Sequence, residues 1–406
     1  MLFSYIKENR KALSAWLVVV LFFSYQYFYR MLPGALSDYI LSNYSLTPSQ
    51  FSKFVGIYYI FYSLAHIPLG LALDRFSIKL VMSACIGLCC VSIMPLYLKL
   101  PYEYLYFGRI ISAICSSVGV ISVLQITSAM MSKKLFPIFF SFSVMFGILS
   151  ASSTFMVVPL LKDPHNIFFF MIVFGGIIFV CSVLFLPHWI DNDDKSQNTQ
   201  EKSLFKSKLW IVIALIGGLL IGSLEGYVDI WANIFVQLKH NLRPEIAGFI
   251  NSLVLVALAL CAPILGFIEG KFREEIDLII LLAFFILFSI SCILFLSLSL
   301  MSLVILNIVL GMGSAYQTIV LIKVSRIVPG NHVSFATAIT NMLMMGMGYF
   351  FHFYSANVLS FLEYDGLPGV VVLQKVLVIL PITSFLAILS LFAVKKYIAS
   401  IPKNNL

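Results

Sequence analysis

The sequence predicts an all-α membrane protein with twelve transmembrane helices in two six-helix, pseudo-symmetric bundles. Three observations lead to this prediction: the composition, the number of long apolar runs and a polar break near the middle of the chain. Of the 406 residues, 61% are hydrophobic and only 11% are charged, and the mean hydropathy is +1.00. A soluble domain carries about 25% charged residues. The chain is therefore expected to cross a membrane many times.

The apolar runs set the number of helices. A helix needs about 20 apolar residues to cross the hydrocarbon core of a bilayer. Such runs cover residues 12–32, 52–73, 78–98, 104–127, 136–160, 166–187, 209–235, 246–268, 276–297, 299–322, 335–358 and 372–394. Basic residues before the first run resemble the start of a signal peptide, but the run is long, contains Arg30 and precedes eleven others. We expect it to be retained as a helix.

The longest polar stretch divides the runs into six and six. It reads DNDDKSQNTQEKS (191–203) and has too little apolar content to form a core. The predicted domains are an N-terminal bundle (1–188), a cytoplasmic central loop (189–208) and a C-terminal bundle (209–406). Shifting one half by 196 residues places LGLALDRF (69–76) on LGFIEGKF (265–272). Half-repeats of this kind indicate two bundles with a cavity between them.

Basic residues in the connections predict the orientation. With the N-terminus inside, the inner connections hold eighteen Lys and Arg residues and the outer ones hold five, which places both termini in the cytoplasm. The net charge of +8 then reflects membrane anchoring, and no basic face with aromatic residues suggests nucleic-acid binding. All seven cysteines lie in apolar runs without disulfide or zinc spacing. We expect no metal, no cofactor and no nucleic acid.

A charged segment follows the second apolar run. PLGLALDRFSIK (68–79) resembles the loop motif of the major facilitator superfamily of secondary transporters, with Gly70, Asp74, Arg75 and Lys79 at the motif positions. A serine stands where that motif usually has a second glycine. The resemblance implies two bundles that rock about a midplane site and expose it to one side at a time.

Two further segments extend the resemblance. YFGRIISAICSSVG (106–119) is similar to the fourth-helix motif of the family, with Arg109 as its basic residue. YQYFYRMLPGALSDYI (25–40) resembles a bacterial branch related to organic-anion transporters and, more distantly, to the lysosomal dipeptide transporter. We therefore expect a multi-pass protein of a bacterial inner membrane that functions as a monomer.

The loop-motif residues are expected to act in gating. Gly70 would allow two helices to approach closely, and Asp74 would accept hydrogen bonds from a neighbouring helix N-terminus and a nearby cation. Lys79 would anchor the start of the next helix. Such contacts can hold the cytoplasmic ends in one of two arrangements. Interfacial anchoring is the alternative, but it explains Arg75 and Lys79 without explaining Asp74.

Basic residues within the apolar runs point to the substrate site, because each costs about 2.5–3.5 kcal/mol to insert and tends to face a cavity or a partner. Arg30 shares a helix face with Gln26 and Tyr27. A guanidinium offers paired hydrogen bonds to a carboxylate or phosphate, so these three residues are predicted to bind substrate. Snorkelling of Arg30 to the outer headgroups is the alternative. For Arg109 both interpretations stay open.

An acidic pair lies in the run at 209–235. Glu225 and Asp229 are four residues apart, and we expect them to couple proton movement to transport. Small residues suited to close helix packing recur here at a spacing of four: Gly218, Gly222 and Gly226. At the offset of 196, Arg30 corresponds to a position between the two acids, so the halves carry opposite charge at matching places. A structural salt bridge or an early helix end is the alternative.

Polar-tipped rings line one face of the run at 52–73. Tyr58, Tyr62 and His66 follow one another at steps of four residues. We expect the two tyrosines to contact substrate. His66 can titrate near neutral pH and is a further candidate for proton coupling, with plain packing as the alternative for all three.

The run at 335–358 repeats this arrangement. Asn341, Met345, Gly348 and His352 share one face. We expect a weaker polar contact to substrate from this helix, with Asn341 as the candidate residue.

These features favour a secondary transporter of a small anionic or zwitterionic solute, such as an amino acid, a short peptide or an organic anion. The expected partners are this solute, protons and the lipid bilayer. No catalytic residue is predicted, because no nucleophile has a spaced partner and no phosphate-binding loop or large extramembrane segment is present. Two alternatives stay open: a transport-inactive receptor or scaffold, and a polytopic membrane enzyme.

Overall fold

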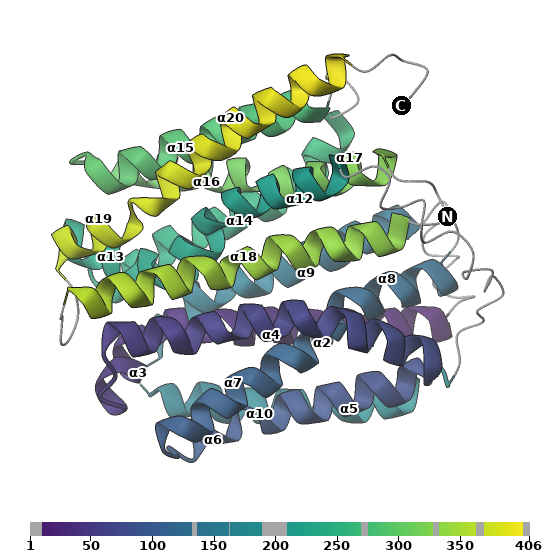
Figure 1. The fold of residues 1–406 in the computed structure, drawn as a ribbon. Coiled ribbons are helices and arrows are strands. Elements are labelled where there is room, and N and C mark those ends of the chain that lie inside the picture. Colours follow the sequence, from purple (N-terminus) through teal and green to yellow (C-terminus); the bar gives the residue numbers. More distant parts are fainter. Residues whose placement is uncertain are drawn as a thin grey trace. The chain divides into compact units, whose positions relative to one another are not determined.

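The computed structural model of the chain describes residues 10–131, 136–161, 163–188, 209–268, 275–327, 333–362 and 369–400. Every regular element within these residues is a helix (Figure 1). The apolar composition accounts for this, because a backbone in lipid must satisfy its own hydrogen bonds and an α-helix does so within one segment. The predicted all-α membrane class is confirmed.

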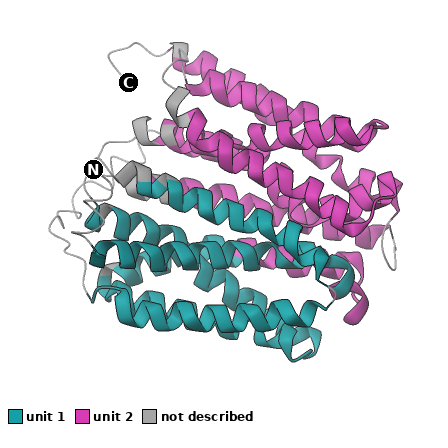
Figure 2. Ribbon diagram, turned by 180° about the vertical axis from the view of Figure 1, so that it is seen from behind, with its two compact units in different colours: residues 1–39, 61–195 teal, residues 40–60, 196–406 magenta. Residues whose placement is uncertain are grey.

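The chain divides into two compact units (Figure 2). Unit 1 comprises residues 1–39 and 61–195, and unit 2 comprises residues 40–60 and 196–406. Two helices, α3 (Ser37–Asn43) and α4 (Pro48–Arg75), run from one unit into the other. The first half of α4 groups with unit 2 and its second half with unit 1. The predicted N-terminal bundle, in contrast, kept all of α4 with the first half of the chain.

Unit 1 is built around α2. Besides the second half of α4, its helices are α2 (Arg10–Ala35), α5 (Ile78–Val91), α6 (Met94–Tyr97), α7 (Tyr102–Ser116), α8 (Val118–Met130), α9 (Phe136–Val157), η1 (Val158–Leu160) and α10 (Pro164–Phe185). Helices α7, α8, α9 and α10 all contact α2. Residues on α2 are therefore placed in the interior of this unit.

Unit 2 holds the remaining helices. They are α12 (Leu209–Leu220), η2 (Gly222–Val228), α13 (Trp231–His240), α14 (Pro244–Ile268), α15 (Glu275–Phe295), α16 (Leu300–Ser314), α17 (Tyr316–Ile327), α18 (Val333–Phe361), α19 (Val370–Leu377) and α20 (Ile379–Ser400). Helix α12 contacts α17, α18 and α20. It takes the interior position in this unit that α2 takes in unit 1.

Helices occupy all twelve predicted runs, and eleven segments of the described chain are long and apolar enough to cross a membrane. The exception is the run at 335–358. It forms α18, a helix of 29 residues, and polar residues such as Asn341 and His352 lower its mean hydropathy. Its hydropathy alone would not identify α18 as a membrane-spanning helix, but it packs against α12 and α17 within unit 2.

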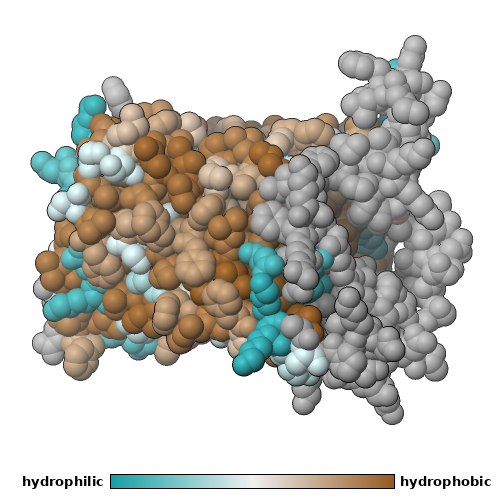
Figure 3. Space-filling view, turned by 90° about the horizontal axis from the view of Figure 1, so that it is seen from above, coloured by the Kyte–Doolittle hydropathy of each residue, from teal (hydrophilic) through white to brown (hydrophobic). Residues whose placement is uncertain are grey.

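The surface of the described helices is largely apolar. Figure 3 shows one face on which most of the described side chains are hydrophobic. Large side chains such as Phe288 of α15 and Phe385 of α20 are exposed. Soluble monomers rarely expose apolar patches of more than a few hundred Å², so this surface is suited to contact with lipid tails.

Hydroxyl groups of α9 join it to α2 in unit 1. The Ser150 hydroxyl donates to the carbonyl of Ser24 at 2.8 Å, and the Thr154 hydroxyl donates to the carbonyl of Phe28 at 3.3 Å. These carbonyls already belong to a helix, so the extra bonds fix one helix against the other. Inter-helix bonds of this kind contribute about 0.6 kcal/mol on average in membrane proteins.

The predicted glycine strip packs against α18 in unit 2. A Cβ atom added at Gly218 would lie 2.6 Å from the side chain of Met347, and one added at Gly222 would lie 2.6 Å from the ring of Phe351. A Cβ added at Gly226 would lie 3.0 Å from the Cβ of Phe351 and 3.3 Å from its ring. Because glycine has no side chain, the two backbones approach closely enough to place α18 beside the acidic pair.

Ion pairs tie helix ends together at the predicted cytoplasmic end of unit 2. Lys323 of α17 lies 3.0 Å from Glu275, and Lys395 of α20 pairs with Asp277. Both acids lie in the first turn of α15, where the helix dipole favours negative charge. The pairs link three helices of one unit, so they strengthen that unit.

Lys239 caps the other end of α15. Its Nζ donates to the carbonyls of Ile293 at 2.6 Å and Leu294 at 3.0 Å, which have no helical donor at a C-terminus. Burial lowers the pKa of Lys239 below its usual value. Burial, and then the charge of Lys239, lower the pKa of the adjacent His240. Lys239 thus caps the C-terminal end of α15, which is the predicted outer end.

Candidate functional site

The acidic pair lies where the helix of residues 209–240 changes its geometry. Between α12 and α13 the chain forms a π-helical turn, η2, which holds Glu225 and has Asp229 as its C-cap residue. The amide of Asp229 donates to the carbonyl of Leu224, five residues earlier, at 3.0 Å. Glu225 is 2% exposed and Asp229 is fully buried. Such turns within α-helices often occur at functional sites.

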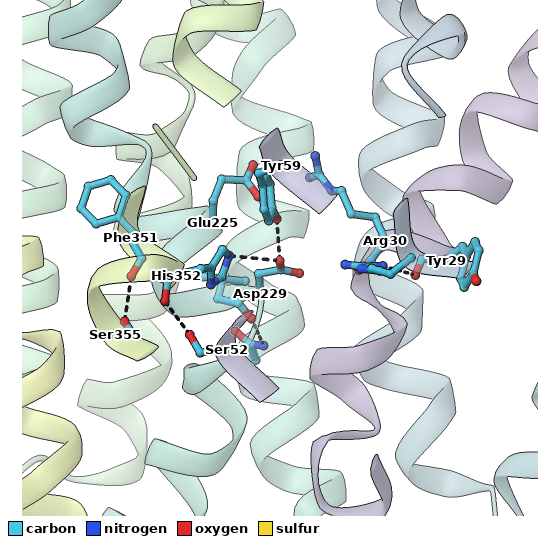
Figure 4. Close-up of polar contacts among 12 residues, drawn as sticks. Tyr29, Arg30, Ser52, Tyr59, Glu225, Asp229, Phe351, His352 and Ser355 are labelled. Atoms are coloured by element: carbon cyan, nitrogen blue, oxygen red, sulfur yellow. Dashed lines mark hydrogen bonds and ion pairs between the residues drawn. The ribbon is translucent and has the colours of Figure 1, made fainter. Parts of the chain in front are cut away.

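One phenol joins the two acids. The hydroxyl of Tyr59, from the first half of α4, contacts a carboxylate oxygen of Glu225 and, at 2.5 Å, one of Asp229 (Figure 4). A phenol carries a single hydroxyl proton and can donate it to only one acceptor at a time. We call Tyr59, Glu225, Asp229 and His352 the acid cluster.

His352 of α18 completes the acid cluster. Its ring stacks on the Tyr59 ring with 5.1 Å between centroids, and its Nε2 lies 3.8 Å from Oδ2 of Asp229. Two glycines make this possible. At Gly56 an added Cβ would collide with His352, and at Gly348 it would lie 2.9 Å from the Tyr59 ring. The first half of α4 and α18 therefore meet through small residues.

Neighbouring side chains support the backbone around the acid cluster. The Ser52 hydroxyl donates to the carbonyl of His352 at 2.8 Å (Figure 4). The amide nitrogen of Asn251 donates to the carbonyl of Val228 at 3.0 Å. The second bond matters because a π-helical turn disturbs the regular hydrogen bonds next to Asp229.

In unit 1, the predicted substrate-binding group is buried on α2. Arg30 is 6% exposed, and Gln26 is 1% exposed. The guanidinium carbon of Arg30 lies 4.6 Å from the centroid of the Tyr27 ring, a cation–π contact. Arg30 and Tyr27 therefore share a face, as predicted. A snorkelling arginine would place its guanidinium at the surface, so the burial of Arg30 argues against that alternative.

Arg109 of α7 is also buried, at 2% exposed, and it does not snorkel. Its Nη1 donates to the carbonyl of Tyr29 at 3.4 Å, and its Nη2 donates to the carbonyl of Arg30 at 3.0 Å. These bonds tie α7 to α2 inside unit 1. The phenol of Tyr29 in turn donates to the carbonyl of Ser92 at 3.0 Å.

The predicted ring face of α4 is divided between the two units. Tyr58 is buried and makes an edge contact with Tyr59, at 5.7 Å between centroids. Tyr62 and His66 belong to unit 1, with ring centroids 4.7 Å apart. Nδ1 of His66 donates to the carbonyl of Tyr62 at 2.8 Å. Within unit 1, His66 therefore pairs with Tyr62 of the same helix. In unit 2, Asn341 is half-buried, eleven residues before His352 on α18.

The loop-motif residues lie at the end of α4 and the start of α5. Among the described residues, no atom lies within 4 Å of a Cβ added at Gly70, so the expected close approach at this glycine stays a prediction. The side chain of Asp74 lies outside the described part of the structure. Arg75 is exposed, and Nζ of Lys79 lies 3.5 Å from Nε2 of His188.

The sequence patterns missed Tyr59 and gave His352 no role. A spacing of four residues points to Tyr58 and Tyr62, but Ser52, Gly56 and Tyr59 make the contact with α18. The small residues Ser52 and Gly56 are the sequence feature that could have indicated this contact face. Among the described residues, no group of three His, Cys, Asp or Glu side chains could hold a metal ion.

Comparison with known proteins identifies the family. The family model of the Major Facilitator Superfamily matches residues 18–352. The structure resembles the nucleoside transporter NupG, with a TM-score of 0.75 at 16% identity, over 95% of this chain and 99% of that one. It also resembles a bacterial homologue of the human lysosomal transporter Spinster in an inward-facing, occupied conformation. That TM-score is 0.74 at 13% identity, over 94% of this chain and 96% of the other.

No match was found among curated proteins. At 12–16% identity the solved structures establish the fold, which is that of membrane transporters, and leave the solute undefined. The family model carries the assignment, because it covers most of the sequence. The chain therefore belongs to the Major Facilitator Superfamily.

Proposed function

We propose that the protein is a proton-coupled secondary transporter that moves a small anionic or zwitterionic solute by alternating access. The observation that carries the proposal is the contact of two buried carboxylates with the single hydroxyl of Tyr59. The proposal puts both termini in the cytoplasm and the protein in a bacterial inner membrane. It acts as a monomer, with Asp74, Arg75 and Lys79 in gating.

Hydrogen-bond chemistry favours one proton on the acid pair. If Glu225 and Asp229 were both ionised, the Tyr59 hydroxyl could donate to one of them, and the other would meet a phenol lone pair. A proton on the second carboxyl turns that repulsive contact into a hydrogen bond. Two carboxyl groups that share a site take up and release protons as a coupled pair. This supports the pair as the carrier of the coupled proton.

His352 provides a partner for proton exchange. Its Nε2 lies 3.8 Å from Asp229, a distance that a small rotation of either side chain would shorten to a hydrogen bond. An imidazole changes its charge near neutral pH in its unperturbed state. Loss of a proton from the acid pair and gain of one by His352 would exchange an intact hydrogen bond for an ion pair.

The solute class follows from the buried substrate-binding group on α2. A guanidinium binds a carboxylate or phosphate through two parallel bonds, and the neighbouring Tyr27 ring suits an apolar or aromatic part of the solute. Amino acids, short peptides and organic anions have both features. NupG is a nucleoside transporter, so an uncharged nucleoside belongs in the test panel as a contrasting solute.

Uptake into proteoliposomes tests the proposal. The panel contains phenylalanine, dialanine, succinate, glucose 6-phosphate and uridine, each measured with and without an imposed pH gradient. We expect accumulation of an anionic or zwitterionic solute that depends on the gradient. Glu225→Gln and Asp229→Asn should abolish accumulation while leaving solute exchange intact. Glu103→Gln, which changes an exposed acid in the first turn of α7, is the matched control.

Two results would contradict the proposal. Uptake that ignores the gradient, with normal accumulation by both acid variants, would make the acid cluster structural and the protein a facilitator or a carrier coupled to another ion. Uptake of uridine and of no other solute in the panel would contradict the proposed anionic or zwitterionic solute class.

A further inference from the structure

Proline breaks the hydrogen bonding of α2 next to Arg30. Pro33 lies inside the helix and has no amide hydrogen, so it cannot donate to the carbonyl of Tyr29, four residues earlier. A carbonyl without a donor in an apolar interior costs several kcal/mol. The position is buried, and the missing donor has to come from another element of unit 1.

Arg109 supplies that donor. Its Nη1 lies 3.4 Å from the Tyr29 carbonyl and its Nη2 lies 3.0 Å from the Arg30 carbonyl. One planar guanidinium therefore bridges two successive carbonyls at the break. A lysine has one nitrogen in place of this fork and could not hold both in the same way.

The two bonds from Arg109 fix the position of the Arg30 backbone, and with it the point from which the Arg30 side chain extends. A helix interrupted by proline can bend at the break, and a bend moves the Cα of Arg30 relative to the helices packed around it. Arg109 bonds the carbonyl of Arg30 itself. The Tyr29 phenol adds a second anchor through its bond to Ser92.

We propose that Arg109 is a positioning residue, which fixes Arg30 by supplying the hydrogen-bond donor that Pro33 removes from α2. This inference rests on the proposed function, in which Arg30 binds the anionic group of the solute. Both of these Arg109 bonds go to backbone oxygens of α2. The inference therefore requires that its effect on binding passes through Arg30 and depends on Pro33.

A double-mutant cycle with Pro33→Ala tests this dependence. Alanine restores the amide hydrogen, which can then donate to Tyr29 within the helix. Calorimetric titration of the detergent-purified full chain uses benzoate as the probe and benzamide as its uncharged match. The variants are Arg109→Met, Pro33→Ala, the double variant and Arg30→Ala, and size-exclusion chromatography and unfolding temperature confirm that each is folded.

We expect Arg109→Met to weaken benzoate binding about tenfold, the loss typical of a hydrogen bond to a charged group. Benzamide binding should change less than about twofold. In the Pro33→Ala background the same Arg109→Met change should weaken benzoate binding less than about threefold, because the Tyr29 carbonyl no longer needs an external donor. If Arg109→Met does not fold, Arg109→Lys takes its place in the cycle.

The outcomes separate this inference from the proposed function. Wild-type benzoate affinity in Arg30→Ala, or no benzoate binding by the wild type, overturns the role of Arg30 and this inference with it. Wild-type affinity in the Arg109 variant, together with loss in Arg30→Ala, overturns the inference alone. So does an equal loss of benzoate and benzamide, or an Arg109 effect of the same size in both backgrounds.

Discussion

The two units satisfy their buried charges in different ways. In unit 1, Arg109 donates to backbone carbonyls, which cannot take up or release a proton. In unit 2, Asp229 and Glu225 meet Tyr59 and His352, whose side chains can. A guanidinium cannot be deprotonated in a protein, so the charges of Arg109 on α7 and Arg30 on α2 are permanent, and the charge of the acid cluster can change with protonation. A permanent cation suits binding of an anion, and a changeable anion suits coupling to protons.

Removal of the permanent charge should have the largest effect. Arg30→Ala should weaken binding of an anionic solute at least about 100-fold, since it removes a paired, charge-assisted bond. Arg30→Lys keeps the charge without the planar fork and should weaken binding about tenfold. Ligand-dependent thermal stabilisation of both variants, with the anion and its amide analogue, measures this.

Arg243→Lys, on an exposed arginine, is the matched control for this series. Normal binding by Arg30→Ala, or equal affinity of the wild type for the anion and its amide, would return Arg30 to a structural role. The contrast between the two units would then be lost.

Removal of the shared hydroxyl should have an intermediate effect. Tyr59→Phe keeps the ring that stacks on His352 but leaves both carboxylates without their phenol partner. We expect gradient-driven accumulation to fall about tenfold, with its pH dependence shifted and anion binding little changed. Tyr104→Phe, on an exposed tyrosine, controls for loss of a phenol. An unchanged pH profile would show that Tyr59 does not share the coupled proton.

A change remote from both regions should alter the rate alone. Asp74→Ala removes the proposed gating acid and should slow transport a few-fold, because it shifts the balance between inward-open and outward-open states. Solute affinity and proton dependence should stay at wild-type values. Glu103→Gln again serves as the control. Normal transport rates at normal expression would reduce Asp74 to an anchoring residue.

The smallest effect is expected at His240. Its pKa is lowered by burial and by Lys239, so the folded state binds this proton less readily than the unfolded state. Folding stability should therefore rise with pH as the pH passes from the folded-state pKa to about 6.5, the ordinary value for histidine. Thermal unfolding of wild type and His240→Gln between pH 5 and 8 measures the difference. A steeper rise in the variant would contradict the assignment.

Much of the fold could be predicted from the sequence, because lipid imposes a simple rule on composition. The need for about 20 apolar residues per crossing located every helical run. The spacing of Gly218, Gly222 and Gly226 located the face that packs against α18. The same rule placed Arg30 and the acidic pair among the candidates, since buried charge is costly in a membrane.

The arrangement of the acid cluster could not be predicted in the same way. A spacing of four assumes a regular α-helix, but η2 winds more loosely between Gly222 and Val228. Tyr59 could not be distinguished from Tyr58 by residue type, because both are aromatic and both are buried. Only the small residues Ser52 and Gly56 distinguish the face that meets α18.

The proline in α2 also has a consequence for biosynthesis. Arg109 follows Tyr29 by 80 residues, and at about 5–20 residues per second the ribosome needs about 4–16 s to make that stretch. Throughout this time the first helix carries a carbonyl that lipid cannot satisfy. The nascent helix is therefore expected to stay at the hydrated insertion machinery until α7 emerges, and to leave for the bilayer together with it. One proline and one distant arginine are thus expected to set an order of membrane insertion within unit 1.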